Sequence, residues 1–193
     1  MPELRRDGDR VFLCGVPRCA NGSILSMFKA SGWSVDYEIL GREEGFSPYQ
    51  TQEVHFRDKV PASFAFIRHP MRRLESVIRD RLKASTSKEV FDRFLSMNVG
   101  DVYRKSGGSF RPAHDLVMDS TEIFKIDRGL HQPLTAFRAR RWLPWSVVES
   151  RENESKGNRV DWTKAPARVV EKVLKDYAQD FYHFDYLTFP EDH

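Results

Sequence analysis

The sequence predicts an α/β fold in which a mainly parallel sheet is flanked by helices. Two strand-loop-helix units support this prediction. The apolar run 11–14 is closed by Gly15, and a loop then leads into the helical apolar pattern of 24–28. A second apolar run, 63–67, has the composition of a buried parallel strand and leads into a helix that Pro70 opens. Because strands alternate with helices, we expect ligands to bind where the strands end, at the loops that follow them.

The rest of the chain continues this alternation. Further strands are expected at 33–39 and 122–126. Further helices are expected over 70–83, after Ser87, which can cap its helix, over 130–142 and from Pro166 onward. Loops are expected at 41–59, 100–119 and 153–158. Pro133 must lie in the first turn of its helix, where it removes no helical hydrogen bond. Aromatic residues after 177 are expected to pack beyond the end of the last helix.

Length and composition predict one soluble globular domain over 1–193. The chain has 193 residues, of which 40% are apolar and 31% charged. The N-terminal segment 1–10 lacks the apolar core of a signal peptide, and no apolar run approaches the roughly 20 residues of a membrane helix. Cys14 and Cys19 have no further cysteine or histidine beside them, which argues against a zinc site or a disulfide framework. We therefore expect a cytoplasmic protein without a membrane anchor.

Basic residues are gathered in two clusters. The formal net charge is +3. One cluster comprises Arg68, Arg72, Arg73, Arg79 and Arg81, and the other comprises Arg138, Arg140 and Arg141. Such clusters suit a polyanionic ligand, although each can also be a solvated helix face. No RNA- or DNA-binding motif accompanies them, so a nucleic-acid partner is not expected.

The loop after the first predicted strand has the features of an anion site. A turn that contains glycine and serine between a strand and a helix directs backbone N–H groups and the positive helix end toward one point. Arg18 adds a fork of donors. The loop is not an ATP-type P-loop, because Gly15 and Gly22 are seven residues apart and no lysine precedes Ser23. A nucleoside triphosphatase is therefore disfavoured.

The stretch 12–23, FLCGVPRCANGS, resembles the 5′-phosphosulfate loop of sulfotransferases, which use 3′-phosphoadenosine-5′-phosphosulfate (PAPS) as sulfuryl donor. In that family the loop usually reads P-[KR]-[ST]-[GA]-[ST]-[ST]. Arg18 stands where many members have a catalytic lysine. Cys19, Asn21 and Gly22 depart from the usual small hydroxyl residues, which removes possible hydrogen bonds to the sulfate. The resemblance assigns PAPS, or its product PAP, to Arg18, Cys19, Ala20, Asn21, Gly22 and Ser23.

A second stretch, 64–76, resembles the 3′-phosphate motif of the same family, a strand followed by R-x-P-x-x-R-[LV]-x-S. Arg68 and Ser76 occupy the two positions that family members use to bind the 3′-phosphate, at the family's spacing of eight. An arginine at the end of a strand offers bidentate donors, and a serine two turns along the next helix adds a hydroxyl. The two motifs stand in the family's order along the chain.

Further segments are similar to sulfotransferases of the carbohydrate type. Residues 110–114 with 123–126 resemble the segment before a later strand, 152–156 resembles a nucleotide-covering loop, and 177–186 follows a closing Y-x-x-D-[FY]-x-x-F-x-Y pattern. The resemblance adds Ser155 and Lys156 to the residues that would bind PAP. The aromatic pattern is interpreted as core packing. The implied architecture is a P-loop-like, nucleotide-binding sulfotransferase fold.

The resemblance implies sulfuryl transfer from PAPS to a hydroxyl or amine without a metal ion. Arg18 would act as an electrostatic clamp on the leaving phosphate, because a guanidinium does not give up its proton in proteins. A hydroxyl acceptor also needs a general base, which relatives supply from the region after the first helix. Among Glu43, Glu44, Glu53 and His55 in that region we prefer Glu44, with His55 second.

The sequence leaves the acceptor and the activity open. A sugar, a peptide or a small metabolite fits a pocket formed by the loops 41–59 and 100–119. The leading interpretation is an active PAPS-dependent sulfotransferase. The departures at Cys19, Asn21 and Gly22 keep open a protein that binds PAP or PAPS without turnover. A small-molecule kinase is a third alternative, but the lysine and the magnesium-binding aspartate that it needs are not found.

Overall fold

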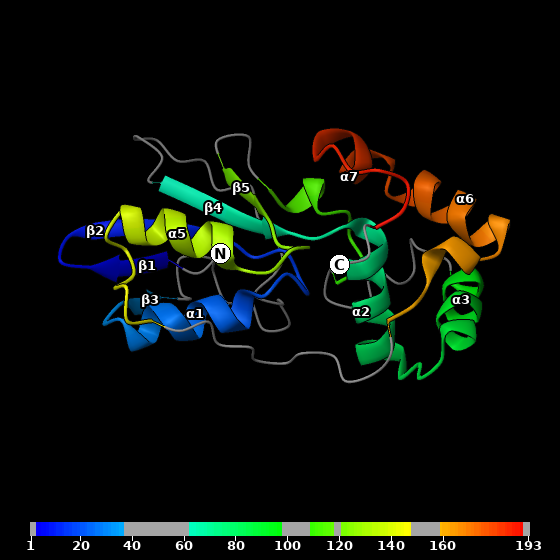
Figure 1. Cartoon of the computed structure of the whole chain (residues 1–193), viewed down its shortest axis with the longest axis horizontal. Coiled ribbons are helices and arrows are strands. Elements are labelled where there is room, and N and C mark those ends of the chain that lie inside the picture. The colour runs from blue at the N-terminus through cyan, green and yellow to red at the C-terminus, as the bar shows by residue number, and fades with distance from the viewer. Residues whose placement is uncertain (1–2, 37–61, 98–108, 118–120, 148–158, 191–193) are drawn as a thin grey trace. The chain divides into compact units, whose positions relative to one another are not determined.

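The computed structural model describes residues 3–36, 62–97, 109–117, 121–147 and 159–190 (Figure 1). The chain divides into two compact units, and each unit combines two stretches of sequence. Unit 1 comprises Met1–Ile67 and Leu116–Glu154, and unit 2 comprises Arg68–Asp115 and Ser155–His193. The single domain expected from the chain length stays a prediction.

Unit 1 is built on a five-stranded sheet with the order β3-β1-β2-β4-β5. Its strands are β1 (Glu3–Arg6), β2 (Asp9–Cys14), β3 (Ser34–Asp36), β4 (Ala62–Ile67) and β5 (Glu122–Lys125). The strands β2, β4 and β5 run parallel, whereas β1 is antiparallel to both of its neighbours. The α/β class is therefore confirmed. The sheet is mixed, however, and only three adjoining strands match the expectation of a mainly parallel sheet.

The strand β1 is not predicted by the sequence analysis, because the N-terminal segment is polar. It pairs with β2 through a hairpin whose turn residues are Asp7 and Gly8. Both have a positive φ, 51° and 89°, as in the type I′ turn that an Asp-Gly pair favours. Glu3 is buried in this strand, and its carboxylate pairs with Arg5 and Arg10. The compensated charge allows a polar segment to form a strand.

The helices α1 (Asn21–Ala30) and α5 (His131–Ala139) pack on one face of the sheet (Figure 1). Phe28 of α1 stacks on Phe64 of β4, with the ring centroids 5.9 Å apart. Phe137 of α5 lies 4.8 Å from Phe64 and 5.5 Å from Phe28. Burial of each ring stabilises this layer by about 1.5–3 kcal/mol, so the three phenylalanines fix both helices to β4.

The opposite face of the sheet has a smaller apolar cluster. It comprises Phe12, Cys14 and Ala65, with Val117 and Ile123 packed against it. The Cys14 thiol lies 3.3 Å from the Thr121 hydroxyl, which is a side-chain contact between β2 and the residue before β5. Cys14 and Cys19 are both buried free thiols, so neither forms a disulfide.

Unit 2 is helical in the part of the chain that the structure describes. Its elements are α2 (Pro70–Leu82), α3 (Ser87–Ser96), α6 (Ala167–Asp176), α7 (Ala178–His183) and a 3-10 turn at Trp162–Lys164, and another 3-10 turn spans His114–Leu116 where the chain passes into unit 1. The core includes Leu74, Val77, Ile78, Phe94, Trp162, Val169, Val173 and Tyr177. The separate helix α7 is not predicted by the sequence. None of the described helices has the length and apolar character needed to cross a bilayer.

The ends of α2 and α3 follow from residues that favour helix starts. Pro70 is the first residue of α2, and the side chain of His69 caps the helix. Thr86 caps α3 and forms a capping box with Glu89, in which each side chain accepts a hydrogen bond from the other's backbone. The cap of α3 is therefore Thr86, and Ser87, the cap suggested by the sequence, is the first helical residue.

Candidate functional site

The loop between β2 and α1 contains two residues in an unusual backbone conformation. Arg18 and Ala20 have φ angles of 65° and 58°, in the left-handed region that residues other than glycine rarely adopt. Such strain costs about 1–3 kcal/mol per residue and occurs mainly at ligand-binding sites and switch regions. Backbones that turn in this way can direct successive N–H groups toward one point, where an anion binds.

The N-terminus of α1 is not neutralised by a side chain of its own first turn. Its N-cap residue, Ala20, makes no side-chain cap hydrogen bond, and the first turn contains no acidic residue. The positive end of the helix and the neighbouring Arg18 therefore both favour a negatively charged ligand at this loop. Ser23 lies in the same turn and is buried.

Two residues that depart from the family pattern are buried in the loop itself. Cys19 is 0% exposed and Asn21 is 8% exposed. The Asn21 Nδ2 atom donates a hydrogen bond to the Val16 carbonyl at 2.8 Å, which fixes the shape of the loop. The Asn21 Oδ1 atom is buried without a hydrogen-bond partner among the described residues. The Nδ2 end of the Asn21 amide therefore has a structural role in the loop.

In unit 2, Arg68 directly precedes the cap of α2 and is partly buried. Within the described part of the chain, its guanidinium makes no hydrogen bond and no ion pair. Arg72 and Arg79 on the same helix both pair with Glu75, at 3.3 and 3.1 Å. Arg81 pairs with the neighbouring aspartate at 3.5 Å. The charge of Arg68 thus stands uncompensated among the described residues, at the N-terminus of a helix.

Arg73, the second arginine of the 64–76 motif, has a structural role. Its side chain is 2% exposed, and its Nη2 atom donates to the carbonyls of Ser109, at 3.2 Å, and Arg111. Its Nη1 atom lies 3.9 Å from the carboxylate of Asp180. Asp180 accepts hydrogen bonds from the backbone N–H groups of 113–114, both at 2.8 Å. This part of the motif therefore holds unit 2 together.

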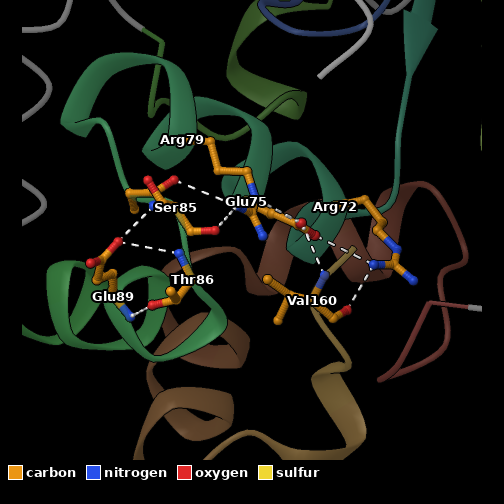
Figure 2. A network of polar contacts seen from close by, with 8 residues as sticks. Arg72, Glu75, Arg79, Ser85, Thr86, Glu89 and Val160 are labelled. Carbon is orange, nitrogen blue, oxygen red and sulfur yellow. Dashed lines mark hydrogen bonds and ion pairs between the residues drawn. The ribbon is translucent and has the colours of Figure 1, made fainter. Parts of the chain in front are cut away.

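Glu75 forms the centre of another buried network on α2 (Figure 2). Its Oε1 atom accepts hydrogen bonds from the Val160 N–H at 3.0 Å and from Arg79 Nε at 3.1 Å. Arg72 Nη1 donates to Glu75 Oε2 at 3.3 Å and to the Val160 carbonyl at 2.8 Å. Val160 is thus held at both of its backbone polar groups by one turn of α2. Arg72 and Arg79 therefore both make their hydrogen bonds to groups of unit 2.

The second basic cluster, at the end of α5, is largely paired within unit 1. Arg140 donates to both carboxylate oxygens of Glu122, at 2.5 and 2.8 Å. Arg138 donates to the Val147 carbonyl at 2.7 Å, and its guanidinium lies 5.4 Å from the centre of the Trp145 ring. Two of the three arginines of this cluster are thus engaged within unit 1 and need no polyanionic ligand.

Comparison with known proteins adds no family at this point. No family model, curated protein or solved structure matches this chain.

The predicted site residues are distributed over both units and over residues outside the described part. Arg18 and its loop belong to unit 1, whereas Arg68 and Ser76 belong to unit 2. Ser76 lies in the second turn of α2 and is 6% exposed. The base candidates Glu43, Glu44, Glu53 and His55, and the loop residues Ser155 and Lys156, lie outside the described residues. Their assignments stay predictions.

The sequence analysis did not predict the structural roles of three residues that shape the start of α2 and its packing, namely His69, Glu75 and Asp180. His69 stands before a proline that opens a helix, which is the N-cap position. Glu75 lies three residues after Arg72 and four before Arg79, which is the spacing of helical ion pairs. Asp180 is the aspartate of the closing pattern over 177–186, but nothing in that pattern marks its contacts with Arg73 and with the backbone of 113–114.

Proposed function

We propose that the chain is a PAPS-dependent sulfotransferase that transfers a sulfuryl group to a hydroxyl or amine of its acceptor. The observation on which the proposal depends is Arg68, whose guanidinium has no partner among the described residues and stands beside the N-terminus of the 13-residue helix α2. An uncompensated guanidinium at a helix N-terminus favours a dianion. The 64–76 motif assigns this position to the 3′-phosphate of the nucleotide, with Ser76 adding a hydroxyl.

The 12–23 motif assigns the 5′ end of the nucleotide to the loop between β2 and α1. Two left-handed residues, an uncapped helix and Arg18 favour an anion there. The strands β2 and β4 are parallel neighbours, with Cys14 opposite Ala65, so the loop after β2 begins at the edge where β4 ends. The chain runs from β4 directly into Arg68. In α/β folds, nucleotides bind at this edge, which is consistent with a P-loop-like sulfotransferase fold.

The proposed reaction breaks the bond between sulfur and the 5′-phosphate oxygen of PAPS while the acceptor atom attacks sulfur from the opposite side. Negative charge then builds on the leaving phosphate, in the manner of phosphoryl transfer, and Arg18 stabilises it as a fixed cation. The acceptor's proton passes to a base, for which Glu44 is the first candidate and His55 the second. The products are PAP and the sulfated acceptor, and no metal ion takes part.

A protein that binds PAP or PAPS without turnover is the second candidate. The buried Cys19 and Asn21 favour it, because they replace hydroxyl residues that would contact the sulfate, and Asn21 binds the loop instead. A small-molecule kinase is the least supported candidate. The proposal leaves the acceptor open among a sugar, a peptide and a small metabolite. It also includes a cytoplasmic location and no nucleic-acid partner.

Calorimetry with PAP and with adenosine 5′-phosphosulfate, which lacks the 3′-phosphate, tests the role of Arg68. Arg68→Ala should weaken the binding of PAP by about 1.5–3 kcal/mol, a factor of about 13 to 160 in Kd. The binding of adenosine 5′-phosphosulfate, which is weaker in wild type, should stay nearly unchanged. Ser76→Ala should weaken PAP less, because it removes a neutral hydrogen bond. Arg81→Ala is the matched control, since it removes a charge of the same cluster that pairs with Asp80. Equal losses for both ligands would show that Arg68 acts through general electrostatics.

A sulfate-transfer assay with sugar, peptide and small-metabolite acceptors separates the enzyme from the binding protein. Glu44→Gln should lower turnover strongly and leave PAP affinity unchanged, because a base acts on the acceptor. If activity survives that change and is lost in His55→Ala, the base is His55. Binding of ATP with magnesium, in place of PAP, would support the kinase instead.

A further inference from the structure

The side chain of His69 makes two hydrogen bonds to different parts of unit 2. Its Nδ1 atom accepts from the Met71 N–H at 3.2 Å, which caps α2. Its Nε2 atom lies 2.9 Å from the carbonyl oxygen of Leu187, in the segment 184–190 after α7, called here the C-terminal segment. His69 is 3% exposed, and its ring makes T-shaped contacts with the rings of Phe181 and Tyr186.

These two partners determine the protonation of the ring. A carbonyl oxygen only accepts, so Nε2 must bear a hydrogen in order to bind Leu187. The Met71 N–H only donates, so Nδ1 must be without a hydrogen. The neutral tautomer with hydrogen on Nε2 is the form that makes both bonds. The ring is therefore a rigid link between the start of α2 and the C-terminal segment.

His69 is also the residue that follows Arg68. As the N-cap it sets the backbone direction with which the chain enters α2, at φ −43° and ψ 129°. The two hydrogen bonds of the ring therefore help to hold the backbone from which the Arg68 side chain extends. The same ring contacts the C-terminal segment. Fixing the backbone at Arg68 therefore favours an ordered C-terminal segment, and an ordered C-terminal segment favours a fixed backbone at Arg68.

We propose that His69 is a positioning residue that couples the C-terminal segment to 3′-phosphate binding at Arg68, an inference that rests on the proposed function. Binding of the 3′-phosphate fixes Arg68 and the adjacent cap, and through His69 Nε2 it stabilises the C-terminal segment. Because coupling is reciprocal, an ordered C-terminal segment strengthens binding of the 3′-phosphate by the same factor.

Two substitutions separate the two bonds of His69. In His69→Asn the Oδ1 atom takes the place of Nδ1 and keeps the cap, but the side chain is too short to reach Leu187. In His69→Gln the amide nitrogen takes the place of Nε2 and can donate to Leu187, but no acceptor remains near the Met71 N–H. His131→Asn, at an exposed position in unit 1, is the matched control.

Amide hydrogen exchange in the free protein tests the two bonds without any ligand. In His69→Asn, amide exchange should be faster in the C-terminal segment and unchanged at Met71. In His69→Gln, exchange should be faster at Met71 and unchanged in the C-terminal segment. Exchange with bound nucleotide then tests the coupling. In wild type and in His131→Asn, PAP should slow exchange of the C-terminal segment, and adenosine 5′-phosphosulfate should not. In His69→Asn the slowing should vanish, and PAP affinity should fall about two- to ten-fold, the factor expected for one neutral hydrogen bond.

The outcomes that overturn the proposal differ from those that overturn the function. If wild type does not bind PAP, the proposed function is wrong, and the coupling is overturned with it. If PAP binds normally but slows the C-terminal segment equally in wild type and in His69→Asn, the coupling alone is wrong. A loss of affinity for both nucleotides together in His69→Asn would mean that His69 only maintains the fold.

Discussion

Replacing Glu75 with glutamine should destabilise unit 2 strongly, although the side chain keeps its size. Glu75 is 6% exposed, and its carboxylate accepts hydrogen bonds from Arg72, Arg79 and the Val160 N–H, at 3.3, 3.1 and 3.0 Å. Glutamine keeps one acceptor oxygen but presents an NH₂ group where a second acceptor stood. It also leaves two guanidinium groups, whose side chains are 11% and 12% exposed, without a compensating charge. Removing one partner of a buried ion pair costs about 3–5 kcal/mol.

Thermal unfolding followed by circular dichroism measures this loss. For a chain of this length, 1 kcal/mol corresponds to about 2–4 °C, so the Tm of Glu75→Gln should fall by about 6–20 °C. Glu171→Gln on α6 is the matched control, because Glu171 is exposed and the described structure gives it no ion pair. Its Tm should stay within about 2 °C of wild type. If the Tm of Glu75→Gln also changed by no more than that, Glu75 would not be compensating the two arginines.

Three other variants test separate parts of the structure. Thr86→Ala removes the cap of α3 and should lower the free energy of unfolding in urea by about 1 kcal/mol. Burial raises the pKa of Glu3, but the hydrogen bonds from Arg5 and Arg10 outweigh this effect and hold the pKa below its ordinary value of 4.5. The contribution of Glu3 to stability is therefore present above pH 4.5 and lost as the pH falls through the lowered pKa, so Glu3→Gln should lose less stability than wild type in acid unfolding curves. Arg18→Ala should lower turnover more than PAP affinity, because the charge it stabilises grows in the transition state; equal losses would make it a binding residue only.

The elements with strong local signals were predictable from the sequence. The strand β4 and the helix α2 were expected at 63–67 and 70–83 and are found at Ala62–Ile67 and Pro70–Leu82, because an apolar run and a helix-opening proline act over a few residues. Pro133 lies in the first turn of α5, as predicted. The strand β1 was missed because its segment is polar and has no apolar run. The Asp-Gly pair at its turn, however, is a known signal of a β-hairpin.

The polar networks of unit 2 could not be predicted, because their partners are far apart in the chain and one partner is often a backbone group. Glu75 binds the Val160 N–H across 85 residues, and His69 binds the Leu187 carbonyl across 118. A backbone group has no side-chain signature that a sequence could reveal. The features near Arg18 and Arg68 that favour an anion were visible in the sequence for the opposite reason, since each lies within one short strand-loop-helix stretch.

The discontinuous composition of unit 2 has a consequence for synthesis on the ribosome. Its first stretch, Arg68–Asp115, is translated before Leu116–Glu154, which belongs to unit 1, and its second stretch follows only afterwards. The apolar stripes of α2 and α3 therefore have no α6 to cover them until the second stretch has been translated. Contacts of such long sequence separation form slowly, and exposed apolar surface invites aggregation in the meantime. A nascent chain of this design gains from chaperones that shield those helices, and a ribosome-stalled chain ending before Val160 should remain sensitive to protease over α2 and α3.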